Sequence, residues 1–425
     1  MMRRVEPLAA LAGRVRVPGD KSASHRALML SALAAGESTI VGLSPGLDVA
    51  STSAIMVQLG ATREDHDDVA HVSGPRDGLR ASDQPMQCGN SGTTIRLVSG
   101  IVSAIEGHHR LVGDASLSRR PMDRVAIPLG LMGSSVIGEG PRITPPLSIV
   151  GSTRLRGIDY SVPTSSAQVK SAILLAGLRA DDVTTVSEAV RTRTTTEDML
   201  RLAGVDVIST NVDAGRRVQL APGRPRPQAW RVPSDPSQAA FFCVLGLIHP
   251  DADLEVVDVD DSPERIGFVH VLERMGAQMS VRPGESGVTM RVRTSTLHAT
   301  EIHSSEIPSV DEVPILTVAA AAATGVSAFR DMGELRLKES DRFEGSMDLA
   351  RRLGCAAWSE GDDFFVEGLT SAAAFAPFAI NAGLDHRIVM SSAVAGCAGR
   401  GCDIDGSDTV SSSYPAFFDD LASLR

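Results

Sequence analysis

Lysine is the scarcest charged residue in this sequence. Only three of its 41 basic residues are lysines, at positions 21, 170 and 338, and the rest are arginines. Nearly every cationic position in this chain is occupied by arginine. The few positions that keep lysine are therefore candidates for sites where a planar guanidinium cannot replace a compact ammonium. Lys21, Lys170 and Lys338 are therefore candidate functional residues.

Cysteines, aromatic residues and long apolar runs are also few. Five cysteines without a CxxC pair predict reduced thiols, not a disulfide framework or a zinc site. An aromatic content of 4% disfavours the stacking platforms of RNA-binding proteins. The longest uncharged apolar stretch, residues 313–323, is shorter than the roughly 18 residues of a membrane span. Glu6 and Pro7 interrupt the N-terminal apolar run, which disfavours a secretion signal.

Length and charge narrow the class of protein further. A chain of 425 residues predicts about two domains, and 43% apolar with 22% charged residues is typical of a globular protein. The net charge of −11 disfavours binding to nucleic acids or anionic membranes, which needs a broad basic face. Any anionic ligand must therefore be attracted by local groups.

A sixfold repeat organises the chain. Six segments begin with Asp, Asn or Ser, which cap helix N-termini, continue through small apolar residues, and end at glycine, which closes helices. Their composition predicts six helices that are buried on nearly every side. The segments start 70 to 76 residues apart, at Asp20, Asn90, Ser165, Asp235, Asp311 and Asp385, and close at Gly36, Gly107, Gly177, Gly246, Gly325 and Gly399.

A second series of glycines, 71 to 78 residues apart, falls between these segments, at Gly60, Gly133, Gly204, Gly276 and Gly354. Helical patterns precede them and β-branched residues follow, so each unit is predicted to be helix, strand, helix, strand. The helix-breaking residues 222–227 separate the third unit from the fourth. We therefore expect two domains of three repeats, residues 20–229 and residues 1–19 with 230–425.

Basic residues accompany three of the predicted helix starts, at 19–26, 89–96 and 164–170. Helix N-termini present free amide donors and partial positive charge, so Ser, Thr and Gly beside Lys or Arg predict seats for phosphate or carboxylate. The first of these lacks the glycines of a phosphate-binding P-loop, and neither GxGxxG, HExxH nor GxSxG occurs. The pattern thus favours an anion-binding protein outside those cofactor and nucleophile classes.

Carboxylates beside cations suggest acid–base chemistry. Glu339 stands between Lys338 and Arg342, and Asp311 begins another predicted helix. Two carboxylates among cations suit proton transfer on a multiply anionic substrate, since the cations offset developing charge.

Several motifs carry a family resemblance over residues 17–415: PGDKSASHR, GNSGTTIR, GDASLSRRPM, SSAQVKSAILLAGL, DEVPIL, RLKESDR and DHRIVM. They resemble the 5-enolpyruvylshikimate-3-phosphate (EPSP) synthase family of enolpyruvyl transferases. The resemblance implies an α/β fold of two inside-out, barrel-like domains, each of three repeated units with buried helices. It places the active site in the cleft between the domains.

The implied reaction transfers the enolpyruvyl group of phosphoenolpyruvate to the 5-hydroxyl of shikimate 3-phosphate by addition–elimination, in the shikimate pathway of aromatic amino-acid synthesis. In the family's mechanism Asp311 takes the hydroxyl proton and Glu339 protonates the methylene carbon; Lys21 contacts phosphoenolpyruvate and is the third expected catalytic residue. The other contacts to phosphoenolpyruvate are expected from Asn90, Gly92, Thr93, Arg120, Arg342 and Arg387. Contacts to shikimate 3-phosphate are expected from Ser22, Arg26, Ser165, Ser166, Gln168 and Lys338, and His386 and Asp311 are further substrate-binding candidates.

The resemblance also implies no metal or organic cofactor, and partners that are small-molecule substrates, not nucleic acids or membranes. We expect a cytoplasmic monomer that closes on its substrates. Two positions depart from the family: Thr195 stands where a histidine is common, and Ser412 stands where some members carry a basic residue.

The nearest alternative is the UDP-N-acetylglucosamine enolpyruvyl transferase family. It typically shows Lys-Asn where this chain has Lys21-Ser22, and a cysteine on the loop of Arg120, where this chain has none. Two more distant candidates are the RNA 3′-phosphate cyclases, which resemble the same repeat, and a non-catalytic anion-binding protein. The acidic charge opposes the former, and retention of Asp311 and Glu339 opposes the latter.

Overall fold

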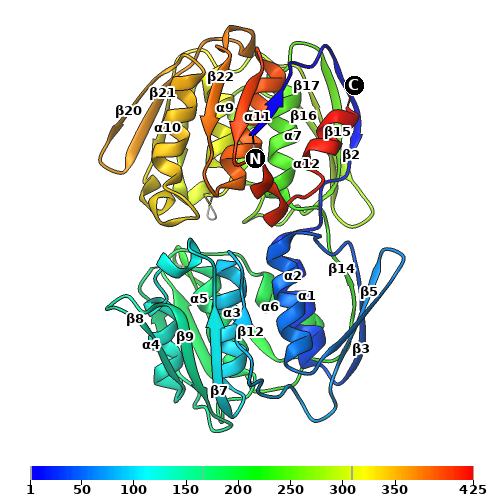
Figure 1. The fold of residues 1–425 in the computed structure, drawn as a ribbon, viewed down its shortest axis with the longest axis vertical. Coiled ribbons are helices and arrows are strands. Elements are labelled where there is room, and N and C mark those ends of the chain that lie inside the picture. The colour runs from blue at the N-terminus through cyan, green and yellow to red at the C-terminus, as the bar shows by residue number, and fades with distance from the viewer. Residues whose placement is uncertain (1, 165, 308–309, 425) are drawn as a thin grey trace. The chain divides into compact units, whose positions relative to one another are not determined.

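The computed structural model describes residues 2–164, 166–307 and 310–424. Contacts divide the chain into two compact units (Figure 1). Unit 1 comprises Met1–Asp20 and Pro233–Arg425, and unit 2 comprises Lys21–Val232.

The unit boundaries differ from the expected ones by a few residues. Asp20 belongs to unit 1, because its backbone N–H donates to Pro233 O at 2.7 Å and its carboxylate lies 2.6 Å from Arg265 Nη2. Residues 230–232 belong to unit 2, because strand β14 (Ala229–Arg231) pairs in parallel with β3 (Gly36–Val41). The expected domains, 20–229 and 1–19 with 230–425, are corrected at these residues.

One strand order recurs across the four-stranded sheets. In the first sheet of unit 2, edge strand β14 lies parallel to β3, which follows a buried helix, and β3 pairs antiparallel with the hairpin β4–β5. Each complete repeat therefore runs helix, strand, helix, two-stranded hairpin and edge strand, which is two strands more than predicted. The strand predicted after Gly60 is β4, Thr62–His66, which reads TREDH and is largely exposed.

The described part of unit 2 contains three such sheets, ordered β14-β3-β5-β4, β6-β7-β9-β8 and β10-β11-β13-β12. Their remaining strands are β5 (Val69–Gly74), β6 (Met86–Gln87), β7 (Gly107–Val112), β8 (Ser135–Glu139), β9 (Thr144–Gly151), β10 (Asp159–Val162), β11 (Thr184–Glu188), β12 (Val207–Val212) and β13 (Gly215–Leu220).

The described part of unit 1 contains sheets ordered β16-β17-β15-β2 and β18-β19-β21-β20, and a three-stranded sheet β1-β23-β22. In the last, the N-terminal strand β1 pairs antiparallel with β23 and takes the hairpin's place. The strands are β1 (Met2–Val5), β2 (Leu11–Val15), β15 (Ala252–Val259), β16 (Gln278–Pro283), β17 (Val288–Arg293), β18 (Glu301–His303), β19 (Val326–Arg330), β20 (Ala356–Glu360), β21 (Asp363–Glu367), β22 (Phe378–Asn381) and β23 (Cys402–Asp405).

Six buried helices match the six predicted segments within the described residues: α1 (Lys21–Leu33), α3 (Gly92–Ser103), α5 (Ala167–Gly177), α7 (Pro236–Ile248), α9 (Val313–Ala322) and α11 (His386–Ala398). In unit 2, α3 packs on α5 so closely that a Cβ on Gly100 would lie 2.2 Å from Ala172 O. In unit 1, α7, α9 and α11 pack on one another (Figure 1). Small residues thus permit the predicted close approach of buried helices.

The remaining helices lie nearer the surface: α2 (Leu47–Gln58), α4 (Asp123–Met132), α6 (Thr195–Leu202), α8 (Gly267–Arg274), α10 (Arg342–Arg352) and α12 (Phe417–Ser423). The five glycines of the second series follow the ends of α2, α4, α6, α8 and α10, and all have positive φ, between 77° and 110°. Left-handed backbone is what a helix-closing glycine supplies, so this part of the repeat prediction is confirmed.

The predicted caps are only partly confirmed. Asp235 and Asp385 cap α7 and α11 by accepting backbone N–H groups, as expected. Ser91, not Asn90, caps α3. Glu312, not Asp311, is the residue before α9, and its side chain makes no cap hydrogen bond. Ser165 lies outside the described residues.

Each unit has its own apolar core, built from its buried helices and the inner faces of its sheets. Gly246, predicted to end a helix, lies inside α7, which continues to Ile248 because its residues are buried throughout. Among the described residues, none of the helices has the length and hydropathy to span a membrane.

Candidate active site

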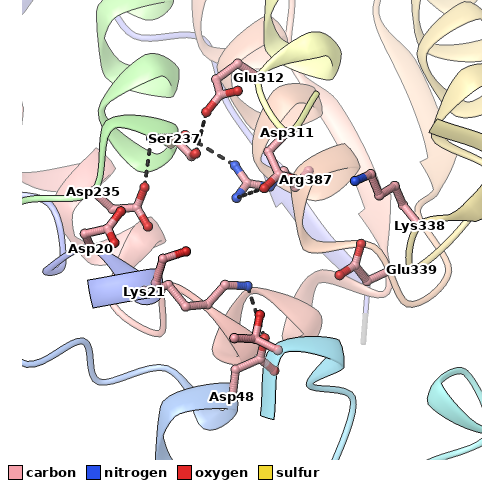
Figure 2. Close-up of polar contacts among 12 residues, drawn as sticks. Asp20, Lys21, Asp48, Asp235, Ser237, Asp311, Glu312, Lys338, Glu339 and Arg387 are labelled. Carbon is pink, nitrogen blue, oxygen red and sulfur yellow. Dashed lines mark hydrogen bonds and ion pairs between the residues drawn. The ribbon is translucent and has the colours of Figure 1, made fainter. Parts of the chain in front are cut away.

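Lys21 opens α1 and is held by a carboxylate from α2. Its Nζ lies 3.1 Å from Asp48 Oδ2, with both side chains mostly buried at 17% and 11% exposure (Figure 2). An opposite charge at this distance restricts the direction of the ammonium. Lys21 is thus a positioned point charge at the start of a buried helix.

The N-terminus of α3 carries a second group of predicted residues. Arg120 Nη2 donates to the amide oxygen of Asn90, and Gln168 Nε2 donates to Thr93 Oγ1 at 2.9 Å. Gly92 leaves space that both nearby arginines use, since a Cβ there would lie 2.8 Å from Arg96 Nη1 and 3.0 Å from Arg120 Nη1. Free helix amides beside two guanidinium groups make this a suitable phosphate or carboxylate site.

Arg26 of α1 is buried and oriented by neutral oxygens. It donates to Thr196 Oγ1 at 2.6 Å, Ser171 Oγ at 2.7 Å and Ser22 O at 2.9 Å. Arg193 donates to Ser22 Oγ at 2.8 Å. Residues 193–197, where the family histidine is missing, therefore still contact the two residues expected to hold the substrate carboxylate.

In unit 1, one fully buried guanidinium joins three carboxylates. Arg342 lies 2.8 Å from Asp311 through Nη1, 2.5 Å from Glu339 through Nη2, and 2.8 Å from Asp385 through Nε. The Asp385 side chain is fully buried, whereas those of Asp311 and Glu339 are 24% and 19% exposed. The structure therefore brings the two predicted acid–base residues together on one cation.

Burial and charge act in opposite directions in this cluster. Burial by itself would lower the pKa of Arg342, but the negative charges of Asp385, Glu339 and Asp311 raise that pKa above its usual value. For Asp385, burial raises the pKa and the charge of Arg342 lowers it, and the net pKa is below normal. The buried pair is thus ionised and well able to hold Asp311 and Glu339 in place.

The remaining predicted residues of unit 1 flank this cluster. Arg387 Nη2 lies 3.6 Å from Asp311 Oδ2, and its Nη1 donates to Ser237 O at 3.4 Å (Figure 2). His386 is buried at the first position of α11. The ammonium of Lys338 lies 2.9 Å from the carboxylate of Glu334, four residues earlier in the chain.

No group of three or more His, Cys, Asp or Glu side chains within the described ranges is arranged to hold a metal ion. The five cysteines are buried and unbridged, as expected. The expectation that no cofactor is needed stays a prediction.

The family comparison decides between the candidate families that share this fold. The model of the family described as EPSP synthase (3-phosphoshikimate 1-carboxyvinyltransferase) matches residues 5–421. The chain belongs to the EPSP synthase family.

Individual relatives and solved structures support the same family assignment. Proteins named 3-phosphoshikimate 1-carboxyvinyltransferase from Streptococcus equi subsp. zooepidemicus and from Synechococcus sp. are 38% and 42% identical, and each alignment covers 98% of this chain and 97% of the relative. The structure of EPSP synthase from Acinetobacter baumannii superposes with a TM-score of 0.86 at 36% identity, covering 100% of this chain and 98% of that one. An enolpyruvyl transferase from Streptomyces tendae, 18% identical with a TM-score of 0.79, shares the fold.

Sequence reasoning identified the motif residues of this EPSP synthase family member but missed several of their partners. Asp48 and Thr196 lie on other helices, 27 and 170 residues from the cations they contact. Arg96, the basic residue of segment 89–96, was noted beside a predicted anion site but was given no role of its own. Asp385 was predicted as a cap, and its second role as the buried partner of Arg342 was not predicted.

Proposed function

We propose that this chain is a 3-phosphoshikimate 1-carboxyvinyltransferase, which transfers the enolpyruvyl group of phosphoenolpyruvate to the 5-hydroxyl of shikimate 3-phosphate and releases phosphate. The observation that carries the proposal is the Arg342 cluster, in which two partly exposed carboxylates share one buried guanidinium in a member of the EPSP synthase family. A chain that only bound anions would have no need of paired carboxylates beside its cations.

The proposed reaction has two stages. The 5-hydroxyl oxygen bonds to carbon 2 of phosphoenolpyruvate while Asp311 accepts the hydroxyl proton and Glu339 delivers a proton to the methylene carbon. In the second stage the Glu339 carboxylate, which has given up its proton, takes a proton from the new methyl group of the tetrahedral intermediate, and the electron pair of that C–H bond restores the double bond. The bond between carbon 2 and the phosphate oxygen breaks, and phosphate leaves with the electron pair of that bond.

Arg342 gives the two carboxylates their different roles. In the unliganded site, its guanidinium contacts both Asp311 and Glu339. An arriving phosphate or carboxylate group competes for the same guanidinium and so weakens its contact with Glu339, the residue proposed as the acid. Asp311 also faces Arg387, 3.6 Å away, and so keeps a second cation beside the proposed base.

The predicted binding residues fall into two groups, one for each substrate. We propose that Lys21, Asn90, Gly92, Thr93, Arg120, Arg342 and Arg387 bind phosphoenolpyruvate, and that Ser22, Arg26, Ser165, Ser166, Gln168, Lys338 and His386 bind shikimate 3-phosphate. The hydrogen bonds that orient Arg26 and Ser22, and the cations beside the α3 N-terminus, support this assignment. Both units would then serve one pair of substrates.

The finer architectural and cellular predictions belong to the same proposal. We interpret each unit as an inside-out, barrel-like domain of three repeats, supported by the buried helices and recurring sheets. We also propose a monomer that works in the cytoplasm. Closure of the two units on the substrates stays a prediction.

Phosphate release from phosphoenolpyruvate, measured with each acceptor in turn, tests the proposal. We expect release, with equimolar enolpyruvyl product identified by mass, when shikimate 3-phosphate is supplied. Release with UDP-N-acetylglucosamine in place of shikimate 3-phosphate would instead assign the chain to the alternative transferase. The acceptors are chemically distinct, so one assay separates the two functions.

A further inference from the structure

Lys170 is the one lysine in this chain that the proposed chemistry does not use. Its side chain is fully buried one turn inside α5. The ammonium donates to Glu188 Oε1 at 3.1 Å and lies 2.7 Å from Glu197 Oε1, a close ion pair without hydrogen-bond geometry. Both carboxylates are also fully buried. A buried cation with two buried anions must have a precise arrangement to be tolerated.

The two carboxylates come from the two ends of one segment. Glu188 is the last residue of β11, and Glu197 lies in the first turn of α6, so the ammonium joins both ends of residues 189–196. Glu188 also accepts hydrogen bonds from Thr192 within the segment, at 2.9 Å from its N–H and 2.6 Å from its hydroxyl. Arg216 Nη1, 4.0 Å from Glu188 and bonded to Thr192 O, supplies a second positive charge.

This segment orients two residues of the proposed acceptor site. Arg193 donates to Ser22 Oγ, and Thr196 Oγ1 accepts from Arg26 Nε. The single hydroxyl hydrogen of Ser171, the residue after Lys170, goes to Ala167 O at 2.6 Å. The 2.6 Å contact between Ser171 and Thr196 is therefore donated by Thr196, which leaves Ser171 to accept from Arg26. The hydroxyl directions around Arg26 are thus fixed from both α5 and α6.

We propose that Lys170 is a positioning residue for the acceptor substrate. Its ion pairs with Glu188 and Glu197 hold residues 189–196 in the conformation in which Arg193 and Thr196 orient Ser22 and Arg26 toward the carboxylate of shikimate 3-phosphate. A compact ammonium suits two carboxylates from separate elements, whereas a planar guanidinium favours two bonds to one carboxylate. This explains why arginine has not replaced lysine here, and it rests on the proposed function.

The test compares the KM values of the two substrates in two variants. Lys170→Met/Glu197→Gln removes the ion pairs of Lys170 together with one positive and one negative charge, so the net charge of the core does not change. Glu188 still has the positive charge of Arg216 nearby. We expect the KM for shikimate 3-phosphate to rise about tenfold, the effect of one disturbed hydrogen bond to a charged group. The KM for phosphoenolpyruvate and kcat should stay at their wild-type values. Glu197→Gln alone keeps the shape of the side chain and should give a smaller rise in the same KM.

Arg201→Met is the matched control. Arg201 is also on α6, but it donates to Val207 O at 2.8 Å and to Ser209, and so ties the helix to β12 on a different side. This variant should lower the melting temperature and leave both KM values unchanged.

Three results would overturn the inference: a wild-type KM for shikimate 3-phosphate in both variants, an equal rise in both KM values, or the same selective rise in Arg201→Met. If the double variant does not fold, Glu197→Gln decides by the same criterion. Turnover by the wild-type chain is measured first with each acceptor, so failure of the proposed function is seen separately from failure of the role of Lys170.

Discussion

In unit 2, Arg26 donates to hydroxyl and carbonyl oxygens and Arg120 donates to the amide oxygen of Asn90, whereas in unit 1 Arg342 contacts three carboxylates. Neutral acceptors orient a guanidinium without offsetting its charge, whereas carboxylates orient it and balance it at the same time. The first arrangement suits recognition of an anionic group. The second suits carboxylates that must exchange protons while an anionic substrate competes for their cation.

Removal of Arg342 should have the largest effect. Arg342→Gln leaves Asp311, Glu339 and the buried Asp385 without their shared cation, so we expect a loss of about 3–5 kcal/mol in the free energy of unfolding together with loss of activity. Denaturant unfolding and turnover measure the two effects. Arg282→Gln, which breaks the exposed pair with Glu255, is the control and should cost less than about 1 kcal/mol. Equal losses would show that the buried cluster contributes no more than a surface pair.

Glu339→Gln should separate chemistry from structure in the same cluster. The amide keeps the shape of the side chain beside Arg342 but cannot deliver a proton to carbon, so kcat should fall by about 10²- to 10⁴-fold. The melting temperature should change far less than in Arg342→Gln. A kcat within a fewfold of the wild-type value would remove Glu339 from the proposed mechanism.

Lys21→Arg tests whether a point charge matters in unit 2. The larger planar group cannot keep the position that Asp48 gives the ammonium, and a misplacement near 1 Å can lower the rate by about 100-fold. Arg282→Lys at the surface should leave kcat/KM unchanged. Comparable small changes in both variants would contradict the argument from lysine scarcity.

A smaller effect is expected from Thr196→Val, which removes the hydroxyl between Arg26 and Ser171. A hydrogen bond to a charged group contributes about 1.5–3 kcal/mol, so the KM for shikimate 3-phosphate should rise by about tenfold or more. The KM for phosphoenolpyruvate, measured in the same titrations, should not change. Equal rises for both substrates would mean that Arg26 does not discriminate between them.

The pH dependence of stability should also distinguish the units. Burial, with the charges of Lys21 and Arg26, lowers the pKa of His25 in unit 2 well below 6.5. The unfolded chain therefore binds this proton first, and stability should fall as the pH drops below about 6.5, by at most about 1.4 kcal/mol per unit.

The pKa of Asp385 in unit 1 is lowered from 3.8, so its contribution is complete above that pH and is lost only as the pH falls further. Unfolding of wild type and His25→Gln between pH 4 and 8 measures the difference. An unchanged slope in the variant would show that His25 is not the group responsible.

The repeat was predictable because its signals are local. A helix-closing glycine needs left-handed backbone, and all five of the second series have it. Local signals were less reliable where neighbouring residues compete for one role, as Ser91 does with Asn90 at the start of α3. One strand was predicted after each glycine of the second series, as Thr62–His66 is after Gly60, but the second hairpin strand and the edge strand, here β5 and β6, were not predicted.

The motif residues of the site were predictable, and their supporting partners were not. No periodic rule links Lys21 to Asp48, or Lys170 to Glu188 and Glu197, since these pairs form between elements that only the fold brings together. The scarcity of lysine still marked all three positions. It could not say which of them touches substrate and which holds other residues in place.

The reaction run in heavy water tests the central claim most directly, because the proposed mechanism requires Glu339 to protonate carbon. If the methylene carbon of phosphoenolpyruvate becomes a methyl group in the intermediate, solvent deuterium must appear in the methylene group of the enolpyruvyl product, as read by mass spectrometry or NMR. We predict deuterium there. A product whose methylene group keeps both original hydrogens would contradict the addition–elimination chemistry that we assign to Asp311, Glu339 and Arg342.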